Sequence, residues 1–511
     1  MSFYVTTPIF YGNGEPHLGH AYSTMAADIL ARHMRQRGED VFFLTGTDEH
    51  GEPIAQAAER EGITPQELVD RSAAQFRQMV ELVDASNDFF IRTTDRGHIE
   101  RVQQVVERVR ENGYVYKGTY LGWYCPRCAD FKNESEIGPD ETCPIHEIPL
   151  DREEEENWFF KLSAFADRLE EMYMAEPERI EPDFRRNEAL AFIRSGLKDV
   201  SLSRSKLSWG VPLPWDPDQV MYVWFDALLN YYTALGYARE DEDLTPRFWP
   251  ATWHILAKDI LKFHAVFWPA FLMAADIEPP RRMFIHGYLL MGEKKMSKSL
   301  GNVLDPFEVI ERFGSDALRY YCFREVSFGQ DGTVSTAGFE SRYETELANE
   351  FGNLASRTLS MVARYRDKTV PEATPDPALA TDFDGLVGRV SGLFDDAAIG
   401  RALDQCWELV RRLNRYVEET QPWVLAKSES NDDREERLDQ VLYSLTEGLR
   451  VVTLLLHPFL PRSSVTLLEA LGNPGLELAE FGSRPGGTEV EKIEPLFPKL
   501  DRDTGEGGDR G

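Results

Sequence analysis

The stretch Phe3–His20, FYVTTPIFYGNGEPHLGH, decides the fold that this sequence predicts. Its first nine residues are rich in aromatic and β-branched side chains, which favour a buried strand, and GNGEP supplies a turn. A helix is predicted next, because Met25, Ile29 and Met34 lie roughly along one helical face and Gly38 is placed to end it. DVFFLTG then predicts a second strand. This order indicates a parallel βαβ unit with a right-handed crossover.

The tetrapeptide HLGH lies at the predicted start of that helix, beyond the carboxyl end of the first strand. Ligands of such sheets bind there, and the N–H groups and dipole of a helix N-terminus favour phosphate. His17 and His20 can donate hydrogen bonds to phosphate oxygens, and Gly19 allows close approach. Taken alone, four residues recur by chance and favour a helix entry with two solvated histidines.

A second candidate motif is KMSKS, which begins at Lys295 and is flanked by Gly292 and Gly301. The glycines predict a mobile loop. Lys295 and Lys298 could neutralise charge that develops on a polyphosphate, and the serines could donate to its oxygens. The alternative for this motif alone is a solvated basic surface loop.

Composition limits the class of protein. The 511 residues carry 56 Lys and Arg against 87 Asp and Glu, a net charge of −31, and 42% are hydrophobic. Such a chain is globular and on average repels polyanions, so any nucleic-acid contact needs locally concentrated basic groups. The start lacks a signal peptide, and the longest apolar run, Ala265–Ala275, is too short to span a bilayer. We expect a cytoplasmic protein with no membrane partner.

Five cysteines, an odd number in a long chain, do not form a secreted disulfide framework. Three of them form two closely spaced pairs of potential metal ligands together with one histidine. The pairs are Cys125 with Cys128, and Cys143 with His146. This spacing suits one tetrahedral Zn²⁺. Because protein fills all four positions, the sequence predicts a structural rather than a catalytic zinc site. Unrelated thiols and a surface histidine are the alternative.

In their order after a βαβ start, HLGH and KMSKS together resemble the signature pair of the class I aminoacyl-tRNA synthetases. The segments PIFYGNGEPHLGH, LTGTDEHGEPIAQAA, MYVWFDALLNYY, FHAVFWPAFLMA and NEFGNLASR are similar to methionyl-tRNA synthetases, over about residues 3 to 430. The resemblance implies activation of L-methionine by ATP to methionyl-adenylate and pyrophosphate. Transfer of methionine to the 3′ end of methionine tRNAs, initiator and elongator, would follow. It also implies Mg²⁺ bound with ATP.

The implied fold class is α/β: a Rossmann-like parallel-sheet catalytic domain with a zinc-binding insertion, followed by an α-helical anticodon-binding domain. The catalytic domain is expected in two halves, 1–117 and 201–290, with the zinc insertion at 118–200 between them. The KMSKS connector is expected at 291–340, the helical domain at 341–497 and a disordered tail at 498–511. Because only a short polar tail follows the helical domain, we expect a monomer.

Aromatic side chains in the similar segments suit a thioether, since sulfur–aromatic contacts add to burial. The resemblance assigns the methionine site to Ile9, Tyr11, Asp48, Trp224, Ala227, Leu228, Tyr231 and His264, with Tyr222 as a further candidate. In this assignment Asp48 pairs with the ammonium of the substrate. Each aromatic alone could be ordinary core.

The resemblance assigns ATP binding to His17, Gly19, His20, Lys295, Ser297 and Lys298, and charge stabilisation in the reaction to the two histidines and two lysines. A GKD element of the family reads Ala257-Lys258-Asp259 here. Its aspartate is retained, so Asp259 is expected to face the reaction centre.

Asn349, Asn353 and Arg357 recur every four residues, opposite an apolar stripe. Amides and guanidinium groups read and stack on bases, whereas periodicity alone favours an ordinary polar face. By resemblance these three residues and Trp423 bind the anticodon.

Two rivals stay open. Another class I synthetase, for cysteine, leucine, isoleucine or valine, is disfavoured by the place of the metal ligands and by the short insertion. A non-enzymatic tRNA-binding relative is disfavoured by the intact signatures.

Overall fold

The computed structural model describes residues 2–125, 130–132, 137–144, 147–291, 306–427 and 432–500. Contacts divide the chain into two compact units. The first comprises Met1–Ala31 and Glu39–Tyr288, and the second comprises Arg32–Gly38 and Leu289–Gly511. Within the described part of the chain, every helix is too short or too polar to cross a lipid bilayer.

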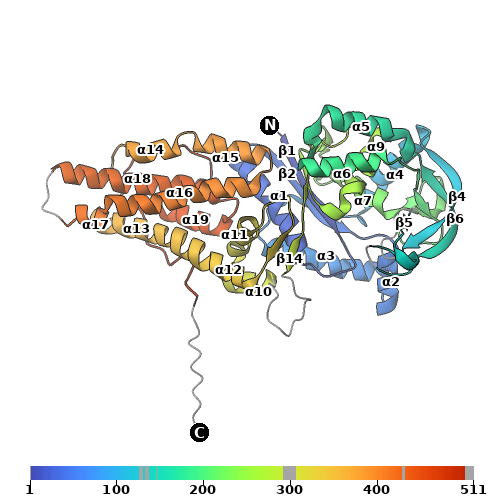
Figure 1. Ribbon diagram of the computed structural model, residues 1–511, viewed down its shortest axis with the longest axis horizontal. Coiled ribbons are helices and arrows are strands. Elements are labelled where there is room, and N and C mark those ends of the chain that lie inside the picture. The colour runs from blue at the N-terminus through green and yellow to red at the C-terminus, as the bar shows by residue number, and fades with distance from the viewer. Residues whose placement is uncertain are drawn as a thin grey trace, which may run out of the picture. The chain divides into compact units, whose positions relative to one another are not determined.

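A six-stranded parallel sheet lies at the centre of the first unit (Figure 1). Its strands in spatial order are β3 (Phe89–Arg92), β2 (Asp40–Asp48), β1 (Ser2–Tyr11), β12 (Trp253–Ala257), β13 (Met283–His286) and β7 (Ile180–Glu181). The expected strand–helix–strand start is confirmed by β1, α1 and β2. Tyr11 pairs with Asp48 in the β1–β2 register, so the carboxyl ends of both strands meet.

Helices connect and cover these strands: α1 (Leu18–Gln36), α2 (Glu52–Glu61), α3 (Pro65–Leu82), α4 (Arg96–Glu111), α5 (Ala166–Ala175), α6 (Asp183–Arg194), α7 (Val223–Thr233), α8 (Thr245–Phe248) and α9 (Trp268–Ala274). A π-helix, Phe263–Phe267, runs directly into α9. Helix α1 differs from the one-sided helix that its spacing suggests, because every residue of 21–31 is buried. A helix that is apolar on most sides is stable only when it is enclosed.

Two smaller sheets complete the first unit. One contains β5 (Asp130–Lys132), β4 (Val115–Cys125), β6 (Asp151–Phe160) and β8 (Val200–Ser201); the other contains β10 (Pro212–Leu213), β11 (Asp216–Met221) and β9 (Ser203–Arg204). Strand β11 therefore does not join the parallel sheet, although it lies in the range expected for the second half of the catalytic domain. Conversely β7 lies inside the range expected for the insertion, yet pairs with β13 in the parallel sheet.

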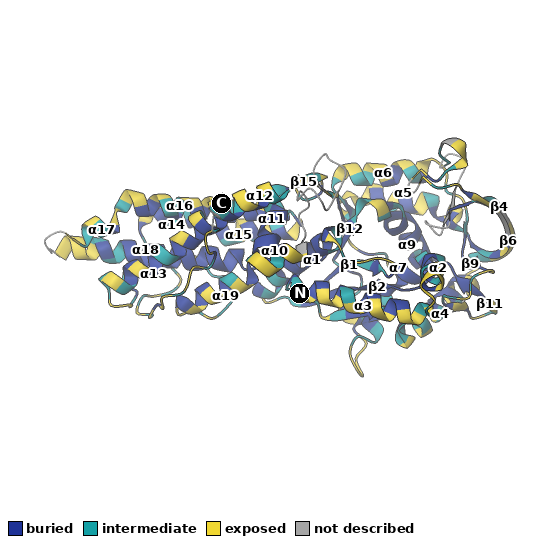
Figure 2. Ribbon diagram, turned by 90° about the horizontal axis from the view of Figure 1, so that it is seen from below, coloured by how far each residue is buried: buried dark blue, intermediate teal, exposed yellow. Residues whose placement is uncertain are grey.

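The second unit is almost entirely helical. A short parallel pair, β14 (Leu289–Met291) and β15 (Gly332–Val334), accompanies its helices α10 (Pro306–Phe313), α11 (Ser315–Glu325), α12 (Thr336–Arg342), α13 (Asn353–Tyr365), α14 (Pro377–Phe383), α15 (Leu386–Asp395), α16 (Ile399–Thr420), α17 (Pro422–Leu425), α18 (Asp432–Leu456) and α19 (Pro461–Ala470). Figure 2 shows buried residues along α16 and α18 and exposed residues on the outer sides of the helices.

A ten-residue π-helix, η9 (Tyr343–Gly352), joins α12 to α13. It carries Asn349 and ends one residue before Asn353, so the predicted polar stripe crosses a change of helix type. The two faces are nevertheless separated as the spacing predicts: both asparagines are exposed, whereas Leu347 and Phe351 are buried.

Candidate active site

The two histidines of HLGH lie against each other at the start of α1. Their ring centroids are 3.6 Å apart with an interplanar angle of 23°, and the His20 ring rests on Phe10 at 4.9 Å and Phe76 at 5.1 Å. A Cβ at Gly19 would lie 3.0 Å from the His17 ring. Any larger residue would therefore push the pair apart.

Backbone contacts fix which ring nitrogens carry protons. The Gly19 N–H donates to His17 Nδ1 at 3.1 Å, and the His17 N–H donates to His20 Nδ1 at 3.2 Å. Since Nδ1 accepts in both rings, each neutral imidazole holds its proton on Nε2. Burial lowers the pKa of both rings, to about 3 for His20, so both are neutral donors at neutral pH. This arrangement suits oxygens of a phosphate chain.

Asp259 follows β12, the parallel neighbour of β1. Its side chain is exposed, yet the surrounding protein desolvates it enough to raise its pKa. Its charge partly offsets the burial that lowers the pKa of His17. The two side chains are therefore electrostatic neighbours at the carboxyl edge of the sheet, which is where the sequence places Asp259.

Asp48 ends β2 and is 8% exposed. The backbone N–H groups of Glu49 and His50 act to lower the pKa of its carboxyl group, but Oδ1 has no hydrogen-bond partner among the described residues. Burial, and next the charge of Asp226, raise the pKa of Asp48 well above its usual value. A buried carboxylate oxygen without a partner is costly, so this position is suited to a cationic ligand.

Tyr231 on α7 and His264 in the π-helix form a buried polar pair. The Tyr231 hydroxyl lies 2.8 Å from His264 Nε2, and His264 Nδ1 lies 3.0 Å from the Ile260 carbonyl oxygen. The carbonyl accepts only, so Nδ1 carries the proton and Nε2 accepts from the tyrosine. Burial lowers the pKa of His264 to about 4. The imidazole is thus neutral, with both nitrogens satisfied.

Of the other predicted pocket residues, Trp224 contacts this pair, and the rest lie on α7, next to α7 or on β1. Trp224 stacks on Phe263 with centroids 3.7 Å apart, and its ring is edge-on to His264 at 6.4 Å. Ala227 and Leu228 are buried on the same helix, while Ile9 and Tyr11 are half-buried on β1. Tyr222 is buried beneath the Arg204 guanidinium, which lies 4.1 Å from its ring centroid.

Two of the four predicted zinc ligands lie within the described residues. Cys125 and Cys143 are fully buried in one small cluster with Leu150. Cys143 begins a tight turn: its N–H donates to the Ile148 carbonyl, and its carbonyl accepts from the Glu147 N–H, both at 2.8 Å. Cys128 and His146 lie outside the described residues, and among the described ones no three potential ligands converge. Two buried thiols in an apolar cluster fit a closed site for a soft-ligand metal.

In the second unit, the predicted polar stripe meets Trp423. The Arg357 guanidinium lies 5.7 Å from the centroid of the half-buried indole and pairs with Glu418 at 2.8 Å. One turn earlier, Asn353 Nδ2 lies 3.4 Å from Asn349 Oδ1. Exposed amides, a cation and an aromatic ring are thus presented together.

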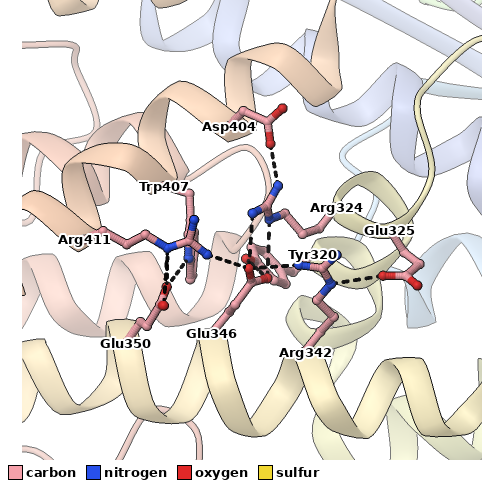
Figure 3. Close-up of polar contacts among 9 residues, drawn as sticks. All are labelled: Tyr320, Arg324, Glu325, Arg342, Glu346, Glu350, Asp404, Trp407 and Arg411. Carbon is pink, nitrogen blue, oxygen red and sulfur yellow. Dashed lines mark hydrogen bonds and ion pairs between the residues drawn. The ribbon is translucent and has the colours of Figure 1, made fainter.

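A buried carboxylate anchors the π-helix that also carries Asn349 (Figure 3). Glu346 is 2% exposed and accepts from the Tyr320 hydroxyl at 2.7 Å. Guanidinium nitrogens of Arg324, Arg342 and Arg411 lie 3.1, 3.0 and 2.9 Å from it. Burial alone would raise the pKa of Glu346, but these donors outweigh it and lower the pKa. The contacts tie η9 to α11, α12 and α16.

Comparison with known proteins decides the family. The family described as "tRNA synthetases class I (M)" matches residues 3–152 and 139–359. A methionine–tRNA ligase of Caldanaerobacter subterraneus subsp. tengcongensis is 44% identical over 508 residues, 98% of this chain and 79% of the relative. The chain belongs to the methionyl-tRNA synthetase family.

Further methionyl-tRNA synthetases agree along nearly the whole chain. The methionine–tRNA ligase of Rhizobium meliloti is 45% identical and is covered to 98%, with 97% of this chain aligned. The structure of Mycobacterium tuberculosis methionyl-tRNA synthetase in complex with methionyl-adenylate has a TM-score of 0.91 and 43% identity, covering 97% of this chain and 99% of that one. The predicted family and α/β synthetase fold are confirmed.

The second signature motif, with Lys295, Ser297 and Lys298, lies outside the described residues. Its role remains a prediction.

Sequence reasoning missed a group of buried polar residues beside the candidate methionine site. Asp226 accepts from His50 Nδ1 at 2.6 Å and from His98 Nε2 at 2.7 Å. The segment TDEHG held a signal, since two acidic residues and a histidine directly follow a buried strand. Nothing in the sequence, however, indicates that Asp226 or His98 meets this segment.

Proposed function

We propose that this chain is a methionine–tRNA ligase: it activates L-methionine with ATP and transfers the methionyl group to methionine tRNA. The proposal is supported by two complementary groups on neighbouring strands: one follows β1 in the chain, and the other ends β2. One is the histidine pair with its Nε2–H donors, and the other is the buried Asp48 carboxylate with an unused oxygen. Family membership supplies the reaction class.

In the first step, His17 and His20 donate to phosphate oxygens of ATP, and Asp48 accepts from the ammonium of methionine. The methionine carboxylate attacks the α-phosphorus, and the bond to the bridging oxygen breaks as pyrophosphate leaves. Positioning and charge stabilisation carry this chemistry, so no side chain becomes a nucleophile. Lys295 and Lys298 neutralise charge on the departing phosphates. Mg²⁺ accompanies ATP and is held largely by the phosphates.

The methionine side chain lies against Trp224, Tyr231 and His264. The Tyr231–His264 pair supports this role, because the hydroxyl proton and both imidazole nitrogens are already engaged in hydrogen bonds. A neutral, saturated wall favours a thioether over a hydroxyl or charged side chain. Aromatic rings around sulfur add to this preference.

In the second step, a hydroxyl of the 3′-terminal adenosine of tRNA attacks the carbonyl carbon of the adenylate, and AMP leaves. Asn349, Asn353, Arg357 and Trp423 read the anticodon. The stacking of Arg357 against Trp423 supports this role, since both side chains already form a surface for an unstacked base.

A structural Zn²⁺ is held by Cys125, Cys128, Cys143 and His146. The shared burial of the two described thiols supports this ligand set. Bound Zn²⁺ would cross-link the segment and contribute folding free energy, with no part in the reaction. The chain acts as a monomer.

The test is ATP–pyrophosphate exchange with each of the twenty amino acids, combined with zinc quantification. Methionine-dependent exchange and about one zinc per chain are expected. Exchange dependent on another amino acid would establish a different class I synthetase, and tRNA binding without any exchange would establish a non-enzymatic relative.

A further inference from the structure

The segment Thr47–Gly51 connects β2 to α2 and holds Asp48 in place. Glu49 is fully buried, accepts from the Thr47 hydroxyl at 2.6 Å and pairs with Arg92 at 2.7 Å. Its carbonyl accepts from the Trp209 indole N–H at 2.7 Å. These contacts immobilise Glu49, the residue after Asp48. The next residue is His50.

His50 makes three directed contacts, each with a different part of the residue. Its backbone N–H stabilises the ionised form of the Asp48 carboxylate and so works against the rise of its pKa. Its carbonyl accepts from the Tyr11 hydroxyl at 2.9 Å, and its ring donates from Nδ1 to Asp226 at 2.6 Å. A shift of the His50 main chain would therefore disturb Asp48 and Tyr11 together, and the bond from the ring to Asp226 opposes such a shift. The next residue, Gly51, has φ +101°, and a Cβ there would lie 2.8 Å from the Tyr11 oxygen.

A second layer holds the His50 ring. The Asp226 carboxylate is fully buried between His50 and His98, whose other nitrogen lies 2.7 Å from the Thr233 hydroxyl. Burial alone would raise the pKa of Asp226, but the two imidazoles outweigh it and lower the pKa to about 2. An ionised acceptor that binds both rings makes the geometry of His50 rigid.

We propose that His50 is the positioning residue of the amino-acid site: its backbone sets Asp48 and Tyr11, and the buried Asp226–His98 pair sets His50. This inference rests on the proposed function, in which Asp48 binds the methionine ammonium. It makes placement of the ammonium depend on two residues that do not touch the substrate, Asp226 and His98, in addition to His50.

Variants of the second layer test this role in ATP–pyrophosphate exchange. Asp226→Asn places an amide N–H₂ against one of two imidazole N–H groups, so one ring must turn or change tautomer. Thr233→Val removes only the hydroxyl behind His98 and is the milder change should Asp226→Asn fail to fold. We expect KM for methionine to rise roughly 10- to 100-fold for Asp226→Asn and less for Thr233→Val, because small misplacements in a site have effects of this size. KM for ATP should stay within about twofold.

Selectivity provides a readout that a merely structural role would not change. The 2-hydroxy analogue of methionine lacks the ammonium, and discrimination against it measures how well Asp48 is placed. Asp226→Asn should lower that discrimination, and combining it with Asp48→Asn should add little. His50→Leu should behave like Asp226→Asn, whereas His50→Asn, which keeps a donor near the Nδ1 position, should recover part of the loss.

Asp28→Asn is the matched control, since Asp28 is also fully buried in the first unit and accepts from Ser86. Its KM values should not change. The inference is overturned if Asp226→Asn and Thr233→Val leave methionine KM unchanged, or raise KM for ATP equally, or leave discrimination against the hydroxy analogue intact. If Asp48→Asn itself leaves methionine KM unchanged, the proposed ammonium site fails, which is a different result.

Discussion

Asp48→Asn is expected to make the free protein more stable and the enzyme far less active. The wild-type carboxylate is 8% exposed, and its Oδ1 has no hydrogen-bond partner in the described structure. Burial raises its pKa above the value of an unfolded chain. Ionised Asp48 therefore costs the native state free energy at neutral pH, and the cost disappears below about pH 4, where the unfolded chain is also protonated.

The expected gain in stability is smaller than the expected loss of activity, when both are expressed as free energies. Leaving a buried polar group unsatisfied costs about 1–3 kcal/mol, of which the amide recovers only part because it has needs of its own. A gain of roughly 1 kcal/mol corresponds to about 1–3 °C in the melting temperature of a unit of this size. Loss of the carboxylate leaves the methionine ammonium without its charge partner, which costs about 3–5 kcal/mol, or roughly 150- to 5000-fold in kcat/KM.

Thermal unfolding with and without methionine, together with pyrophosphate exchange, measures both effects. Asp48→Asn should melt higher than the wild type without ligand at pH 7.5 and equally at pH 4. Saturating methionine should stabilise the wild type but hardly the variant. A variant that melts lower without ligand, or that keeps the methionine-induced shift, would refute the reasoning from the unpaired oxygen.

Four further outcomes are expected. Trp423→Ala should lower kcat/KM for tRNA roughly 5- to 150-fold and leave methionine-dependent exchange unchanged, whereas equal losses would make Trp423 structural. Cys125→Ser, or treatment with a chelator, should release zinc and lower the melting temperature; a zinc-free wild type would contradict this. His20→Gln, which keeps an N–H donor, should retain more exchange activity than His20→Ala, and exchange between pH 6 and 8 should show no titration from His20, whose pKa is about 3. Glu346→Gln should destabilise the second unit by about 3 kcal/mol at neutral pH; since the folded pKa is lowered, the difference from wild type should close as pH falls through that pKa, and a constant difference would count against it.

Local sequence was sufficient for the first strand, helix and strand, because their signals lie within fifty residues. It did not reveal the pairing of DREEEEN, an acidic run inside the range expected for the zinc insertion. These residues begin β6, where Glu155 is buried and accepts from the N–H groups of Ser205 and Lys206. Burial of a charge becomes favourable only when distant donors reach it, and sequence spacing does not report that. The pairing of β7 with β13 is likewise a contact between distant segments.

In the site, too, features set by neighbouring residues could be predicted, whereas contacts between distant segments could not. The position of HLGH at the start of α1 could be predicted from the motif, but the proton positions on His17 and His20 required the Gly19 and His17 N–H contacts. Asp226 meets His50 across 176 residues and His98 across 128. A lone aspartate within an apolar helix indicates that it needs partners, without naming them.

The π-helix Tyr343–Gly352 makes the proposed tRNA-recognition face sensitive to chain length. A π-turn holds one residue more than an α-turn, so deleting a single residue would let the segment relax into an uninterrupted α-helix. Every side chain before the deletion would then be rotated by about 100° relative to those after it. The side chains of Asn349 and Glu346 would then point in new directions, while the side chain of Arg357 would keep its direction. Homologous chains that differ by one residue here would thus present differently oriented surfaces to the same anticodon, even with identical side chains.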